Sequence, residues 1–196
     1  MTRILGLDIS SSVIGISVIK VNDAFIHLES VEYYEPPSTQ KVSLFKSLIE
    51  TKKYIIEKIK HLNPDKIVIE DIAEHFAGGA STSKTIIKLA VYNRTIGLSI
   101  YETFNIEPIM INVNTIRSII RPKDHVGRLL KEDVPQAIEK ILNIKFPYEY
   151  KKSGQIDSTS YDMADAISAA LAYQMALDNN KPLSKVKKKK TKKKNV

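Results

Sequence analysis

The chain has 196 residues, 43% of them hydrophobic, and contains no cysteine. This length favours one domain that buries about 70% of the surface of its unfolded chain. The lack of cysteine excludes disulfides, thiolate catalysis and cysteine-ligated zinc. No apolar stretch approaches the roughly 18 residues that span a membrane, and the N-terminus lacks the apolar core of a signal peptide. We therefore expect a cytoplasmic protein with no membrane partner.

The formal net charge of +8 is unevenly distributed along the chain. Residues 181–196 contain nine lysines and no acid, so residues 1–180 carry a net charge of −1. This composition predicts a folded domain over residues 1–178 and a disordered Lys-rich tail over residues 179–196. The tail is either a solubility or localisation segment or an arm that binds phosphates without sequence preference.

The order of predicted elements indicates an α/β fold. Apolar and alternating runs predict five strands, at residues 3–9, 13–21, 24–33, 66–70 and 108–113. Helical periodicity predicts helices over residues 40–62, 83–104, 131–142 and 161–177, with an irregular stretch over residues 117–127. Ile87, Leu98 and Tyr101 are expected on the buried side of the second helix, and Ser160 is expected to cap the last one. This order predicts a mixed five-stranded sheet with helices on both faces.

Four carboxylates lie beside apolar segments, where an unpaired charge is costly. Asp8 follows the run Ile4-Leu5-Gly6-Leu7, and Glu70 follows Ile67-Val68-Ile69. Asp162 and Asp165 are three residues apart at the start of an Ala-rich helix, so they share one helix face. Adjacent strands would bring Asp8 and Glu70 to the same end of the sheet, below that helix.

Each acid also has a plainer explanation. Asp8 could be a turn residue, and Asp162 could only stabilise a helix N-terminus. Asp71 or Glu74 could replace Glu70, although Glu70 directly continues the apolar run. All four acids together favour a metal site.

Carboxylates without histidine or cysteine select hard cations, so we expect Mg²⁺, with Mn²⁺ as a substitute. Two such ions about 3.5–4 Å apart would activate water and stabilise the leaving oxygen in phosphodiester hydrolysis. Asp8, Glu70, Asp162 and Asp165 are therefore candidate catalytic residues and metal ligands.

These segments resemble the RuvC family of Holliday junction resolvases. The resemblance covers residues 3 to about 175 and includes the order and approximate spacing of all four acids. It implies a ribonuclease H-like fold and a metal-dependent endodeoxyribonuclease that acts in DNA recombination and repair. It also implies a homodimer that cuts opposing strands of a four-way DNA junction in pairs.

The resemblance extends to basic residues. Lys131 opens a Lys-x-x-Val segment whose lysine lies near the scissile phosphate in the family, so it joins the candidate catalytic residues. Four further residues are candidate phosphate contacts, although a solvated basic loop would explain them equally well: Arg117, Arg121, Lys123 and Arg128.

Two departures from the family pattern stand out. An aromatic residue that helps to open the junction usually lies three residues after the glutamate, where this chain has Ala73. Phe76 could stack on DNA in its place or could pack in the core. The Lys-rich tail is also additional, and a bacteriophage or other viral branch of the family would suit both features.

Other functions remain open from the sequence. The same fold could serve a YqgF-like ribonuclease, a nuclease that selects flaps and Y-junctions, or a catalytically idle DNA-binding module. An ATP-binding protein of the actin and sugar-kinase fold also begins with an acidic first strand, but it needs a second similar domain.

Overall fold

The computed structural model describes residues 1–72 and 83–183. The predicted stacking residue Phe76 and residues 184–196 of the Lys-rich tail lie outside this part of the chain. The elements in chain order are β1 (Thr2–Ile9), β2 (Ile14–Val21), β3 (Ile26–Tyr34), α1 (Leu44–Leu62), β4 (Lys66–Asp71), α2 (Ser83–Phe104), β5 (Ile109–Asn112), α3 (Val113–Ile120), the short 3₁₀ helix η1 (Lys131–Asp133), α4 (Val134–Leu142) and α5 (Thr159–Asp178).

A mixed five-stranded sheet forms the centre of the molecule, as predicted. Its strand order is β3-β2-β1-β4-β5. The first three strands form an antiparallel meander, whereas β4 runs parallel to both β1 and β5. Because parallel strands end at the same edge, the ends of β1 and β4 lie side by side there.

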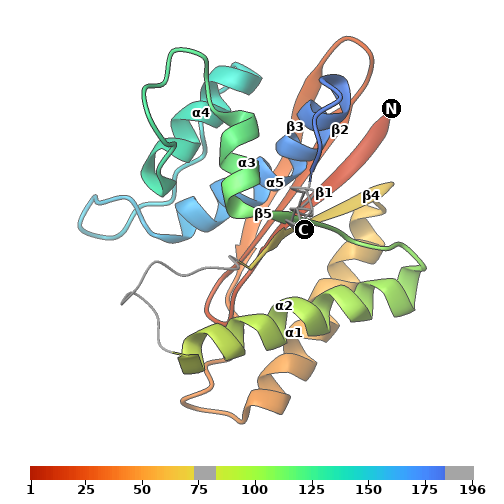
Figure 1. The fold of residues 1–196 in the computed structure, drawn as a ribbon. Helices are drawn as coiled ribbons and strands as arrows, with labels where there is room; N and C mark the ends of the chain where they lie inside the picture. Colours follow the sequence, from red (N-terminus) through yellow and green to blue (C-terminus); the bar gives the residue numbers. More distant parts are fainter. Residues whose placement is uncertain (73–82, 184–196) are drawn as a thin grey trace, which may run out of the picture.

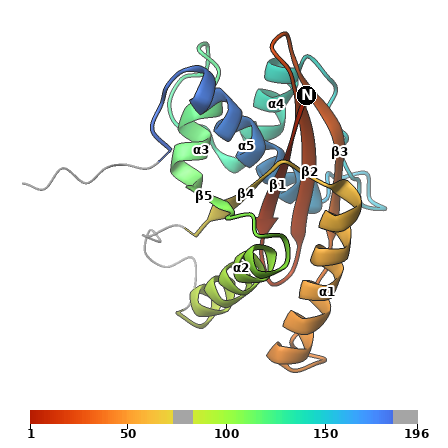
Figure 2. The ribbon, with the colours of Figure 1, turned by 90° about the vertical axis from the view of Figure 1, so that its right-hand side faces the viewer.

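Helices cover both faces of the sheet (Figures 1 and 2). Leu5, Leu7 and other alternate residues pack against α1 and α2, whereas Ile4 belongs to the core beneath α3, α4 and α5. Since side chains alternate between faces along a strand, Asp8 faces the α5 side together with Ile4.

The irregular stretch expected over residues 117–127 is partly wrong. The stretch from Arg117 is helical, because Asn112 accepts a hydrogen bond from the Asn114 backbone and caps α3. The residue before Pro122 then ends α3. The predicted helix over 131–142 is confirmed, with the 3₁₀ turn η1 before α4 begins at residue 134.

Ser160 does not cap the last helix. The helix α5 begins at Thr159, whose backbone and hydroxyl both donate to the Asp157 carboxylate. The Ser160 hydroxyl is buried and bonds the backbone of Glu149 in the preceding loop. The side chain that accepts from the first backbone N–H of α5 is therefore Asp157, two residues before the helix begins.

The buried side of α2 also differs from the prediction. Ile87, Leu98 and Tyr101 are 63%, 58% and 48% exposed, whereas Tyr92 and Ile96 are fully buried. A helix that is apolar on both sides gives no clear periodic signal for its buried face.

None of the helices in residues 1–72 and 83–183 combines the length and hydropathy that crossing a bilayer requires.

Candidate active site

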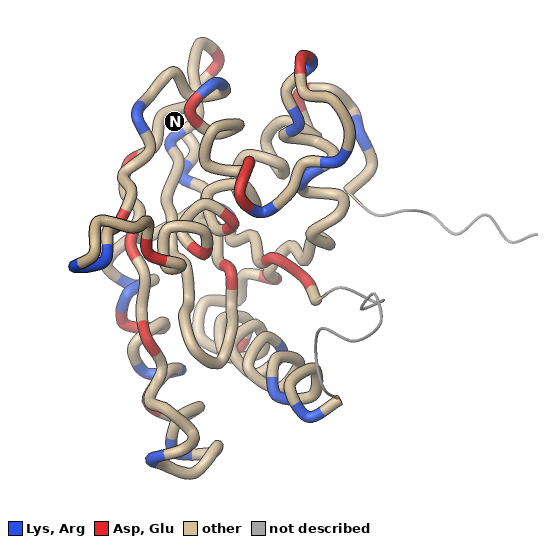
Figure 3. The backbone as a smooth tube through the Cα atoms, turned by 90° about the vertical axis from the view of Figure 1, so that its left-hand side faces the viewer, with Lys and Arg blue, Asp and Glu red and all other residues tan. Residues whose placement is uncertain are grey.

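Three separate elements bring the four predicted acids together. Asp8 lies near the end of β1, and Glu70 lies near the end of the adjacent parallel strand β4. Asp162 and Asp165 lie in the first two turns of α5, which packs on β1 and β2. Figure 3 shows several acidic segments near the middle of the view.

Two basic side chains enter this acid cluster. The Lys131 Nζ lies 2.8 Å from Asp162 Oδ1 and 3.4 Å from Asp165 Oδ2. Arg117 Nη2 lies 3.6 Å from Asp165 Oδ1, and only 4% of the Asp165 side chain is exposed. The four acids and two bases carry a net charge of −2 if all are ionised. Negative charge therefore exceeds positive charge in a largely buried site.

Burial and mutual repulsion oppose ionisation of these acids. Burial raises the pKa of Asp8 well above its ordinary value, the Asp165 carboxylate raises it further, and the Lys131 ammonium lowers it. The pKa of Glu70 is also raised well above its ordinary value, by burial and then by the carboxylates of Asp8 and Asp165. Burial raises the pKa of Asp165 despite the opposing charges of Lys131 and Arg117. A bound cation would relieve both effects.

The pKa of Lys131 is raised, which favours the charged form of this side chain. Burial alone would lower it, but the carboxylates of Asp165 and Asp162 outweigh burial and raise the pKa. Lys131 therefore keeps its positive charge at neutral pH. An ammonium 40% exposed at the edge of the cluster is accessible to an anionic ligand.

Buried polar atoms without a hydrogen-bond partner mark the same site. Among the described residues, these include Glu70 Oε2, Asp165 Oδ1 and Arg117 Nε. Buried oxygen atoms usually have a hydrogen-bond partner, so Glu70 Oε2 and Asp165 Oδ1, the latter facing only Arg117 at 3.6 Å, are donors that suit a cation. Hard carboxylate donors of this kind fit Mg²⁺ or Mn²⁺. Within residues 1–72 and 83–183, no three acidic or histidine side chains already enclose a metal position.

A small recess opens beside Asp8 and Glu70. It has a volume of about 200 Å³, and its other lining residues include Leu89, Asn93 and Val113. The buried Asn93 amide donates to the Glu70 backbone carbonyl at 2.9 Å and so fixes this end of β4. The sequence analysis missed Asn93, although an asparagine inside an apolar helix pattern was the available signal.

Asp71, the alternative to Glu70, has a different environment. Its Oδ1 atom lies 2.7 Å from Arg94 Nη2, which extends from α2. Glu70 instead interacts electrostatically with Asp8 and Asp165. Of these two acids, Glu70 is therefore the one that lies beside Asp8 and Asp165, and the other alternative, Glu74, lies outside the described residues.

The predicted phosphate contacts divide into two groups. Arg117, Arg121 and Arg128 line one cavity of about 410 Å³ beside α3, together with Asn114, Ser118 and Leu129. Arg117 belongs to both this cavity and the acid cluster, so the two are adjacent. Lys123 is exposed in the loop after α3 and is not among the residues that line the cavity.

Comparison with solved structures identifies the fold. Thermus thermophilus RuvC in complex with a Holliday junction substrate matches with a TM-score of 0.67 and 14% identity, over 91% of this chain and 96% of RuvC. The chain has the ribonuclease H-like fold of RuvC. The yeast mitochondrial Holliday junction resolvase Ydc2 matches with a TM-score of 0.58 and 14% identity, over 89% of this chain and 78% of Ydc2.

The same ribonuclease H-like fold occurs in a viral protein. The fowlpox virus resolvase, solved with Holliday junction DNA, matches with a TM-score of 0.50 and 16% identity, over 89% of this chain and 98% of the resolvase. No protein-family model matches the sequence, and no curated protein matches it by sequence. The likeness at these identities concerns the fold, and the activity has to be argued from the site.

Proposed function

We propose that this protein is a metal-dependent endodeoxyribonuclease that resolves four-way and other branched DNA junctions by paired phosphodiester hydrolysis. The observation that carries this proposal is the convergence of Asp8, Glu70, Asp162 and Asp165 from three elements, with two buried carboxylate oxygens that accept no hydrogen bond. The fold is shared with resolvases that were solved with junction DNA.

Asp8, Glu70, Asp162 and Asp165 would hold Mg²⁺ or Mn²⁺, with two ions per site. When bound, these ions supply an activated water and stabilisation of the leaving oxygen. The buried position of Asp165 on a rigid helix keeps its carboxylate in place, since the first turns of α5 pack directly on the sheet.

Lys131 and Arg117 contribute positive charge from the protein itself. Lys131 contacts two of the acids and remains partly exposed, so it can also reach a phosphate at the edge of the cluster. Charge that is already positioned where negative charge develops lowers the barrier to phosphodiester cleavage. Arg117 is more deeply placed and orients Asp165.

The arginine-lined cavity would bind the DNA backbone next to the cut. Arg121 donates to the Gly127 carbonyl and Arg128 donates to the Asn114 side chain, so neutral partners position both guanidinium groups. Their positive charges remain available for phosphate oxygens. Contacts of this kind fix the position of DNA without reading its sequence, which suits an enzyme that selects a branched shape.

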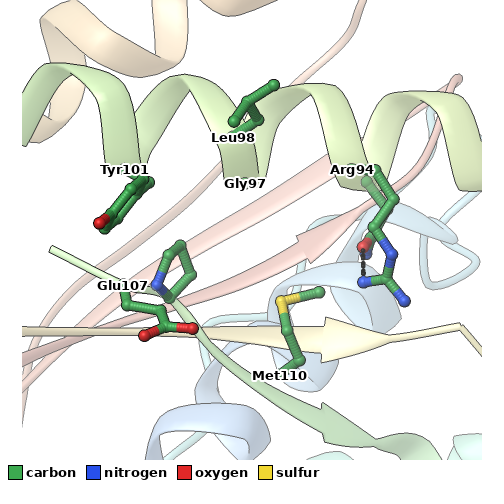
Figure 4. A pocket seen from close by; sticks show the side chains of 8 residues that line it. Arg94, Gly97, Leu98, Tyr101, Glu107 and Met110 are labelled. Atoms are coloured by element: carbon green, nitrogen blue, oxygen red, sulfur yellow. Dashed lines mark hydrogen bonds between the residues drawn. The ribbon is translucent and has the colours of Figure 1, made fainter. Parts of the chain in front are cut away.

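A homodimer would place two active sites on one junction, and α2 provides the candidate contact surface. A groove of about 430 Å³ lies between α2 and the edge strand β5, and its lining includes Gly97, Leu98 and Tyr101 (Figure 4). Arg94 and Glu107 line the same groove. A surface with exposed apolar side chains and both signs of charge can pair with a second copy of itself.

The proposal is tested by comparing Glu70→Gln with Asp71→Asn on a four-way junction in Mg²⁺. The neighbouring acid is a matched control, because it is also partly exposed at the end of β4 but pairs with Arg94. We expect Glu70→Gln to abolish cleavage and to keep junction binding, whereas Asp71→Asn keeps both. Equal cleavage by the two variants would refute the assignment of the site.

A further inference from the structure

Two glycines with no part in the proposed chemistry lie directly beneath α5, the helix that carries Asp162 and Asp165. Gly6 is in β1 and Gly15 is in β2, on the face of the sheet that carries Asp8 and α5. Gly15 is the cross-strand partner of Asp8 in the β1–β2 ladder, and Gly6 is the partner of Ser17. Gly15 therefore lies next to the first acid of the cluster.

The backbone of α5 occupies the space that a side chain would need at both positions. A Cβ atom added to Gly15 would lie 2.7 Å from the Asp162 carbonyl carbon, closer still to the carbonyl oxygen, and 3.1 Å from the Ala166 Cβ. A Cβ atom added to Gly6 would collide with the Ala166 carbonyl oxygen. Carbon atoms in contact are about 3.5–4.0 Å apart, so neither position admits a side chain without movement of the helix.

The two contacts fall on a single turn of α5, from residue 162 to residue 166, and this turn carries both helix acids. Its distance from the sheet therefore sets the distance from Asp162 and Asp165 to Asp8. We infer that Gly15, supported by Gly6, is a positioning residue that fixes the depth of α5 and so gathers the four carboxylates around the metal. This inference rests on the proposed function.

The size of the effect follows from the geometry. A methyl group at Gly15 has to displace the Asp162 carbonyl by about 1 Å or more to reach an ordinary contact distance. A misplacement of about 1 Å in a catalytic group can cost roughly 100-fold in rate. We expect Gly15→Ala to lower kcat about 100-fold and to weaken Mn²⁺ binding at least about tenfold, with the KM for the junction unchanged.

The experiment compares Gly15→Ala with Ile59→Val, which removes one buried methylene from α1 on the opposite face of the sheet. This control accounts for a modest loss of stability that leaves α5 in place. Mn²⁺ affinity is measured on the protein alone by calorimetry, followed by kcat and KM on a four-way junction. A thermal melt without metal shows that each variant folds.

A selective loss of Mn²⁺ affinity and kcat in Gly15→Ala, absent from Ile59→Val, would support the inference. Equal behaviour of the two variants would overturn it. If Gly15→Ala does not fold, Ala166→Ser is used instead, because it adds one oxygen atom to the side chain that faces Gly15. Wild-type Mn²⁺ affinity and kcat in Ala166→Ser would overturn the inference. A wild-type protein that binds no Mn²⁺ and cuts no junction would instead overturn the proposed function, and the role of Gly15 with it.

Discussion

Replacing Asp8 with asparagine should stabilise the metal-free protein while it abolishes cleavage. Burial and the Asp165 carboxylate raise the Asp8 pKa, so folding at neutral pH disfavours the charged form of this side chain. We therefore expect Asp8→Asn to raise the free energy of unfolding at pH 7 in the presence of chelator by about 1–3 kcal/mol, the usual desolvation penalty of one unsatisfied buried group.

The stability difference between Asp8→Asn and the wild type should depend on pH. The folded protein holds the Asp8 proton more tightly than the unfolded chain does, so ionisation of this group lowers wild-type stability as pH rises from the unfolded pKa through the raised folded pKa. The advantage of Asp8→Asn should therefore shrink as pH falls to about 4, near the unfolded pKa, where Asp8 is protonated in the folded state and about half protonated in the unfolded chain.

Urea denaturation with chelator, at pH 7 and pH 4, measures this difference. Asp71→Asn is the matched control, because Asp71 pairs with Arg94 and its replacement should not stabilise the protein. Mg²⁺ should then stabilise the wild type more than Asp8→Asn, because a ligand that binds only the folded state adds its binding free energy. A destabilised or unchanged Asp8→Asn variant at pH 7 would refute the argument that the acids repel one another.

Further predictions concern charge, pH and assembly. Lys131→Met should lower kcat about 100-fold with little change in junction affinity; an unchanged kcat would exclude a role near the scissile phosphate. Arg121→Ala and Arg128→Ala should each reduce the slope of log affinity against log salt by about 1, measured by fluorescence anisotropy, whereas an unchanged slope would remove that arginine from the interface. Mn²⁺ affinity should fall as pH falls through the raised pKa of Asp8, since the ion competes with the proton; a pH-independent affinity would contradict this. Leu98→Glu should convert a dimer into a monomer in light scattering, and a persistent dimer would place the interface elsewhere.

The sheet and the acid positions could be predicted because they depend on short, regular patterns. The apolar runs before Asp8 and Glu70 predicted that both acids lie at strand ends, and the parallel β1–β4 pair brings these two ends together. The spacing of three residues placed Asp162 and Asp165 on one side of a helix.

Other parts of the site depend on contacts that a sequence pattern does not record. Arg117 was expected in an irregular stretch, but α3 brings its guanidinium to within 3.6 Å of Asp165. The depth of α5 above Gly15 depends on a backbone contact between segments about 150 residues apart. Ile87 and Leu98 were wrongly assigned to the core. When a helix is apolar on two sides, its neighbours in the fold decide which side is buried, and the sequence pattern does not show those neighbours.

Cleavage of a synthetic mobile four-way junction tests the central claim most directly. Linear duplex, Y-junction and single-stranded RNA serve as parallel substrates, each with Mg²⁺, with Mn²⁺ and with chelator. The account predicts paired symmetric nicks in the junction that require a divalent cation and disappear in Asp165→Asn. Metal-dependent cleavage of Y-junctions equally well would indicate a broader debranching nuclease, and cleavage of RNA alone would indicate a ribonuclease. No metal-dependent cleavage of any substrate would contradict the account.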